Sequence, residues 1–333
     1  AFGQVMWVAA LLAGIKPAVV AIVLQAVHRI GSRTLHHPGL WAIAAASFAA
    51  IFVWDVPFPW IVLSAALIGG WGHRRWPAVF QTGGHGSASH AIPNTPDLAP
   101  SHTRFSVWGL AQVLAVGMAL WALPMALVVG LWGWHNGFAE MGWFFTKAAW
   151  MTFGGAYAVL PYVYQGAVQQ FGWLSASQMM DGLALGESTP GPLIMVVAFV
   201  GFLGGYQQQW LGADHALAAG VLAACWATWF TFLPSFVFIL GGGPIVERTH
   251  GQHHLTAPLT AITASVVGVV LNLALFFAWH VLWPQAWAGP FDAVAALLTL
   301  AASAALWHFK RSVIEVIVAC ACLSLLWQWA TGM

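Results

Sequence analysis

Charged side chains are scarce in this sequence. They make up 6% of the 333 residues, whereas soluble domains carry about 25%. A soluble fold could not cover its surface with so few. The formal net charge of +1 excludes a nucleic-acid-binding protein, because such proteins neutralise phosphates with a basic face. The three cysteines, Cys225, Cys320 and Cys322, lie in apolar runs. We expect them to be free thiols, and we expect no metal site and no cofactor.

Apolar residues dominate instead, at 60% of the chain, with 22 Trp and 21 Phe. Many runs are long enough, or nearly so, to cross about 30 Å of hydrocarbon. The expected spans are residues 4–27, 40–54, 58–71, 107–134, 143–164, 190–206, 216–240, 259–283, 291–309 and 313–329. The sequence therefore predicts an all-α polytopic membrane protein with about ten membrane segments.

A polar, Pro- and Gly-rich stretch at residues 73–104 separates the apolar segments into two groups. We interpret it as a linker between a region at 1–72 and a region at 105–333. Basic residues gather in alternate loops, and placing these loops in the cytoplasm gives a consistent orientation. The linker is then cytoplasmic, as is an expected loop at 165–189.

The sequence contains a weak internal repeat. Residues 19–25 (VVAIVLQ) are similar to 267–273 (VGVVLNL), and 49–52 (AAIF) are similar to 304–307 (AALW). In each case one long span precedes a short pair. The expected topology gives the copies opposite orientations, which is typical of inverted-repeat transporters. The region from 105 to 251 has no upstream partner, so we expect that more than 100 residues of a first half are missing.

Two segments have the composition of broken helices. Gly154-Gly155 lies within an apolar run, and Ser188-Thr189 precedes Pro190 as an N-cap precedes a first helical turn. Free N–H groups from Gly191 to Leu193 would then favour an anion. The alternative is that the small residues only pack helices or shape a loop.

These segments resemble signature motifs of the chromate ion transporter family. The motifs are residues 152–157 (TFGGAY) and 187–192 (ESTPGP), and 16–20 (KPAVV) is similar to the end of that family's first half. The resemblance implies transport of chromate, and of sulfate, across the bacterial inner membrane, with chromate resistance. It also implies two related halves of opposite orientation. The first half's own Gly-Gly and Pro-Gly-Pro region does not occur in this sequence.

Three charged residues inside or beside these segments are candidates for function. Lys16 and Lys147 fall within expected spans, where a charge is costly and usually faces a cavity. The alternative is a lysine that reaches the membrane surface along its aliphatic stem. Glu187 could carry a coupling proton, or it could cap the helix expected from Pro190.

We expect a tetrahedral oxyanion to bind near mid-membrane while the two halves rock to alternate access. The expected substrate-binding residues are Lys16, Lys147, Thr152, Gly154, Gly155, Ser188, Thr189, Gly191 and Leu193. Membrane lipid and a second copy of the chain are further possible partners. A passive anion channel remains an alternative. A membrane-embedded enzyme is a weaker one, because His280 and His308 are isolated.

Overall fold

The computed structural model describes residues 6–80, 107–152, 156–188, 195–248, 256–284 and 290–331. Within these ranges the chain is helical and contains no strand. The elements are α1 (Met6–Thr34), α2 (Pro38–Trp54), α3 (Phe58–Arg75), α4 (Pro77–Phe80), α5 (Val107–Trp132), α6 (Gly137–Trp150), α7 (Ala156–Tyr164), the π-helix η3 (Gln165–Gln170), α8 (Ala176–Ser188), α9 (Val196–Gln207), the 3-10 turn η5 (Ala213–His215), α10 (Ala216–Arg248), α11 (Thr256–Leu282), α12 (Ala293–Trp307) and α13 (Val313–Thr331).

The protein is an all-α polytopic membrane protein, as the sequence predicts. Five helices in the described ranges are long and apolar enough to cross a membrane, and α2, α3, α9 and α12 are shorter apolar helices. The long helix α5 exposes large apolar side chains such as Leu123, at 70%, and Leu127, at 63%. In water such a surface would be unfavourable, whereas lipid accommodates it.

The segment at 143–164 is divided, because α6 ends at Trp150 and α7 begins at Ala156, on either side of the Gly154-Gly155 pair at which the sequence predicts a broken helix. One sequence prediction needs correction. The loop expected at 165–189 is wrong, since η3 and α8 fill most of it. Helix α8 packs against α1, α9 and α13 and buries Met179, Met180 and Leu183. The other residues of α8 include Ser, Gln, Asp and Glu, which lower its mean hydropathy, so a search for apolar runs does not detect this helix.

The predicted linker at 73–104 is only partly described. Helix α3 continues to Arg75 and α4 occupies Pro77–Phe80, so the start of this stretch is helical. Phe80 is buried and α4 packs against α2, α3 and α11. Residues 81–106 lie outside the described ranges.

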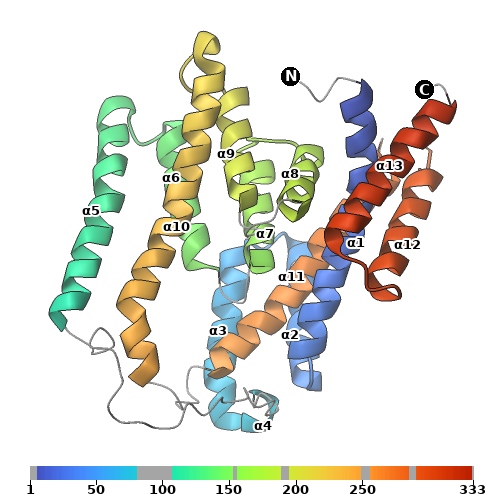
Figure 1. The fold of residues 1–333 in the computed structure, drawn as a ribbon. Coiled ribbons are helices and arrows are strands. Elements are labelled where there is room, and N and C mark those ends of the chain that lie inside the picture. Colours follow the sequence, from blue (N-terminus) through green and yellow to red (C-terminus); the bar gives the residue numbers. More distant parts are fainter. Residues whose placement is uncertain are drawn as a thin grey trace, which may run out of the picture.

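The helices around α1 and α11 pack reciprocally (Figure 1). Helix α1 contacts α12 and α13, α11 contacts α2 and α3, and α1 and α11 contact each other. Close approach depends on glycine: a Cβ at Gly14 would overlap the Cys320 carbonyl of α13, and one at Gly268 would overlap the Ala44 carbonyl of α2. In Figure 1 the α2–α3 hairpin lies toward the lower end of the molecule and the α12–α13 hairpin toward the upper end.

A second group of helices forms around α10, which packs against α5, α6 and α9. Helices α7 and α8 lie between the two groups, because α7 contacts α6 and α11 while α8 contacts α1 and α9. The largest buried apolar cluster runs through this junction and includes Phe145, Leu160, Leu183 and Phe277. Three of the residues predicted to bind an anion, Lys16, Lys147 and Ser188, lie on α1, α6 and α8, which meet here.

Candidate anion-transport site

Lys16 projects from the middle of α1 onto α8. Its ammonium group donates a hydrogen bond of 2.6 Å to the Ser177 hydroxyl and lies 3.7 Å from Asp181 Oδ1. The Lys16 and Asp181 side chains are 26% and 15% exposed. The Lys16 side chain is therefore held between α1 and α8 by contacts with Ser177 and Asp181.

Glu187 lies in the last turn of α8 and pairs with α7. The Tyr157 hydroxyl donates a short hydrogen bond to Glu187 Oε1, and Arg29 of α1 lies 5.8 Å from the centre of the Tyr157 ring. The helix start at Pro190 that Glu187 was expected to cap lies outside the described residues.

Lys147 occupies a different place, in the last turn of α6. Its ammonium group lies 5.9 Å from the centre of the Trp143 ring, and the side chain lines a cavity of about 330 Å³. The other residues around this cavity are Asp55, Pro57, Pro59, Tyr162, Gln165, Gly166, Gln169 and Gln170. Lys147 therefore faces a hollow whose lining includes the Asp55 carboxylate and the amides of Gln165, Gln169 and Gln170.

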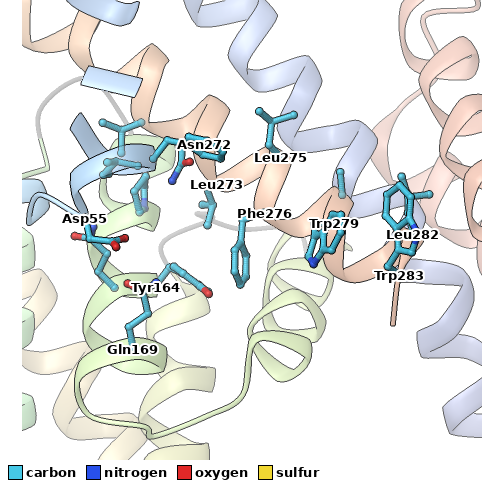
Figure 2. Close-up of a pocket in the computed structure, with 16 residues that line it drawn as sticks. Asp55, Tyr164, Gln169, Asn272, Leu273, Leu275, Phe276, Trp279, Leu282 and Trp283 are labelled. Atoms are coloured by element: carbon cyan, nitrogen blue, oxygen red, sulfur yellow. The ribbon is translucent and has the colours of Figure 1, made fainter. Parts of the chain in front are cut away.

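A larger cavity adjoins the first one and shares Asp55, Gln165 and Gln169 with it. Its volume is about 750 Å³, and α2, α7, η3 and α11 supply its walls. Figure 2 shows Asp55, Tyr164 and Gln169 on one side of this space and Asn272 with Phe276 on the α11 side. Most residues that line this cavity are apolar, and its polar lining includes Asp55, Gln165, Gln169 and Asn272.

The turn between α2 and α3 closes the cavities and is tied to η3. Asp55 adopts a left-handed conformation, with φ of 48°, and ends α2. The Phe58 N–H donates a 2.9 Å hydrogen bond to Gln165 Oε1. π-Helical turns are rare and often lie at functional sites. Sequence reasoning missed Asp55, Gln165 and Gln169, although Gln165, Gln169 and Gln170 between apolar segments could have signalled this polar lining.

The remaining predicted residues are only partly described. The Thr152 hydroxyl donates a 2.7 Å hydrogen bond to the Ala148 carbonyl within its own turn, so it would have to rotate to bind an anion. Ser188 is the last residue of α8. Gly154, Gly155, Thr189, Gly191 and Leu193 lie outside the described residues. The cavity lined by Lys147 does not include Lys16, so the structure does not bring the two lysines into one pocket.

Comparison with known proteins gives a consistent match. The sequence profile named Chromate transporter matches residues 1–70 and 139–325. The chain belongs to the chromate transporter family. The matched ranges contain Lys16, Lys147 and Asp181, whereas the predicted linker at 73–104 falls in the unmatched interval.

Curated relatives agree with this assignment. A chromate transport protein of Cupriavidus metallidurans is 25% identical over 97% of this chain and 67% of its own length. A chromate transport protein of Pseudomonas aeruginosa is 32% identical over 92% of this chain and 64% of its own length. The chain thus spans about two thirds of either relative. A probable chromate transport protein of Synechococcus elongatus is 30% identical over 40% of this chain and 32% of its own length. No solved structure matches the chain.

Proposed function

We propose that the protein transports chromate, or a related tetrahedral oxyanion such as sulfate, out of the cell and so confers chromate resistance. The site of action is the bacterial inner membrane. The family match supports an oxyanion substrate, and both long relatives carry the name chromate transport protein.

The observation that carries this proposal is the placement of two lysines inside an apolar protein. Lys16 ends on α8, and Lys147 lines a polar cavity. Charged side chains within membrane segments are costly and commonly mark ion pathways. Two positively charged side chains that face the protein interior would offset the double negative charge of an oxyanion that crosses the membrane.

The proposed transport cycle uses both regions of the chain, residues 1–72 and 105–333, as parts of two related units of opposite orientation. The reciprocal packing of α1 with α12 and α13, and of α11 with α2 and α3, supports such a repeat. Rocking of one unit against the other would expose the anion to each side in turn. The anion would bind Lys16 at one stage of the cycle. At another it would bind Lys147, the hydroxyls of Thr152, Ser188 and Thr189, and backbone N–H groups from Gly191 to Leu193, near Gly154 and Gly155.

Outward movement of a dianion is favoured by the membrane potential. An inside-negative potential contributes about 2.3 kcal/mol per charge per 100 mV. Efflux therefore needs no other energy source in principle. A passive anion channel would use the same driving force, but its flux would not saturate as the anion concentration rises.

Chromate accumulation in bacteria tests the proposal. Cells that express the gene should accumulate less chromate and grow better on chromate than cells with an empty vector. Lys147→Ala should weaken both effects, whereas Lys310→Ala, in the exposed turn before α13, should not. Equal accumulation in expressing and control cells, with the protein confirmed in the membrane, would move the substrate assignment elsewhere.

A further inference from the structure

Asp181 is a carboxylate that the predicted site does not use. It lies on α8 beside α1, and its Oδ1 atom is buried without a hydrogen-bond partner. Its counter-charge is the Lys16 ammonium group at 3.7 Å, whose 2.6 Å hydrogen bond goes to Ser177 instead. A buried charged oxygen without a hydrogen bond is unfavourable. The pair is therefore held mainly by charge attraction.

The other titratable groups on the helices that pack against α8 have contacts with residues other than Asp181, or are exposed. Within the described ranges, Arg29 of α1 lies over the ring of Tyr157 of α7, whose hydroxyl binds Glu187. His28 of α1 lies edge-on to Trp307, and Arg33 near the end of α1 is exposed. Tyr162 and Tyr164 of α7 pack on Phe144 and Phe276, and Tyr206 of α9 stacks on Phe202. His280 of α11 is bonded to the Phe276 carbonyl. Glu315 of α13 is exposed and paired with Arg311, and Cys322 of α13 is exposed. Cys320 of α13 is buried against α1. Lys16 is the cation that acts on Asp181.

We propose that Asp181 is the proton-carrying group of the transporter and that it competes with the oxyanion for Lys16. This inference rests on the proposed function. When the dianion takes the Lys16 ammonium group, Asp181 loses its counter-charge and binds one proton from water. When the anion leaves, the carboxylate releases that proton to water and pairs with Lys16 again.

The competition fixes the stoichiometry of transport. One proton enters Asp181 for each dianion that binds, and both leave on the same side. Each cycle then moves one net negative charge and not two. The weak geometry of the pair supports this exchange, because a carboxylate with firm hydrogen bonds would be harder to displace.

The distribution of chromate at a fixed membrane potential tests the stoichiometry. Purified protein in proteoliposomes, buffered to the same alkaline pH on both sides, is held at about 60 mV, positive inside. One net charge per cycle predicts roughly tenfold accumulation of chromate inside at equilibrium, and two predict roughly a hundredfold. We expect the wild-type protein to give the tenfold ratio. Sulfate, if carried, repeats the test with an anion that stays fully deprotonated.

A variant of Asp181 that cannot bind a proton distinguishes a proton-carrying role of this residue from a purely structural role in its ion pair with Lys16. Asp181→Asn keeps the shape of the side chain and cannot bind the proton, so it should still carry chromate and reach the hundredfold ratio. A pH-sensitive dye inside lightly buffered vesicles should report proton entry with chromate for the wild type and none for Asp181→Asn. Glu315→Gln, which alters the exposed pair with Arg311, should behave like the wild type.

Each failure has a different meaning. Chromate transport by the wild type at the hundredfold ratio, with no proton entry, overturns the role of Asp181 and leaves oxyanion transport intact. Proton entry that persists in Asp181→Asn also overturns it. No chromate flux through the folded wild-type protein overturns the proposed function itself. The wild-type ratio requires no variant, so the test stands even where Asp181→Asn fails to fold.

Discussion

Helices α1 and α11 occupy equivalent places in the packing but differ in charge. Each contacts two helices that the sequence predicts to belong to the other copy of an internal repeat: α1 contacts α12 and α13, and α11 contacts α2 and α3. The alignment of residues 19–25 with 267–273 puts Ala264 of α11 at the position of Lys16, and Ala264 is fully buried. Helix α11 contains no Asp, Glu, Lys or Arg, whereas α1 carries Lys16, Arg29 and Arg33. The shared architecture therefore needs only small apolar contacts, and the charge facing α8 is an addition confined to α1.

The largest expected effect comes from breaking the shared packing. Gly268→Leu would push a side chain into the Ala44 backbone of α2, and backbone cannot move as a flexible side chain does. We expect a loss of roughly 3 kcal/mol or more, seen as little folded protein in detergent and a lower unfolding temperature. Gly130→Leu on α5, where no atom lies within 4 Å of the added Cβ, is the control. Equal unfolding temperatures for the two variants would contradict this packing.

The next effect concerns the charge that distinguishes α1. Lys16→Ala makes α1 resemble α11 and leaves Asp181 without its cation. Lys16 is the cation that the dianion would bind between α1 and α8, so its loss should lower chromate transport at least tenfold. The measurement is initial chromate flux per folded protein in proteoliposomes. Lys310→Ala should keep full flux, and an unchanged flux in Lys16→Ala would remove Lys16 from the anion path.

A smaller effect is expected at the second lysine. Lys147 is partly exposed to a polar cavity and has no close acidic partner at ion-pair distance among the described residues. Lys147→Ala should weaken chromate transport by about three- to tenfold, because one favourable charge is lost from a hydrated site. The apparent affinity should fall more than the maximal rate. Lys147→Arg should restore most of it, and failure of the arginine to do so would indicate a packing role.

Where α7 meets α8, we expect an effect on stability and the smallest effect on transport. Tyr157→Phe removes the hydroxyl that binds Glu187 and leaves the ring. A single hydrogen bond to a charged group contributes about 1.5–3 kcal/mol, so the unfolding temperature should drop by a few degrees. Tyr206→Phe keeps the stacking on Phe202 and should change nothing measurable. Identical stability of both variants would show that the Tyr157 contact contributes little.

The sequence predicts the membrane class and most helices, because runs of apolar residues follow directly from burial in lipid. It fails at α8, whose stability comes from packing Met179 and Leu183 against neighbours and not from an apolar run. It also misses Asp181 as the partner of Lys16, since the two lie 165 positions apart and only the fold joins them. Lys16 and Lys147 were identified because a charge within an apolar run is conspicuous.

The most direct test of oxyanion transport is the chromate flux into proteoliposomes of the purified protein, measured over a range of chromate concentrations with the potential clamped. We predict a flux that saturates, that accumulates chromate when the potential is positive inside, and that falls at least tenfold in Lys16→Ala. Flux that rises linearly without saturation would indicate a channel. The absence of any flux through folded protein would contradict the proposed transport.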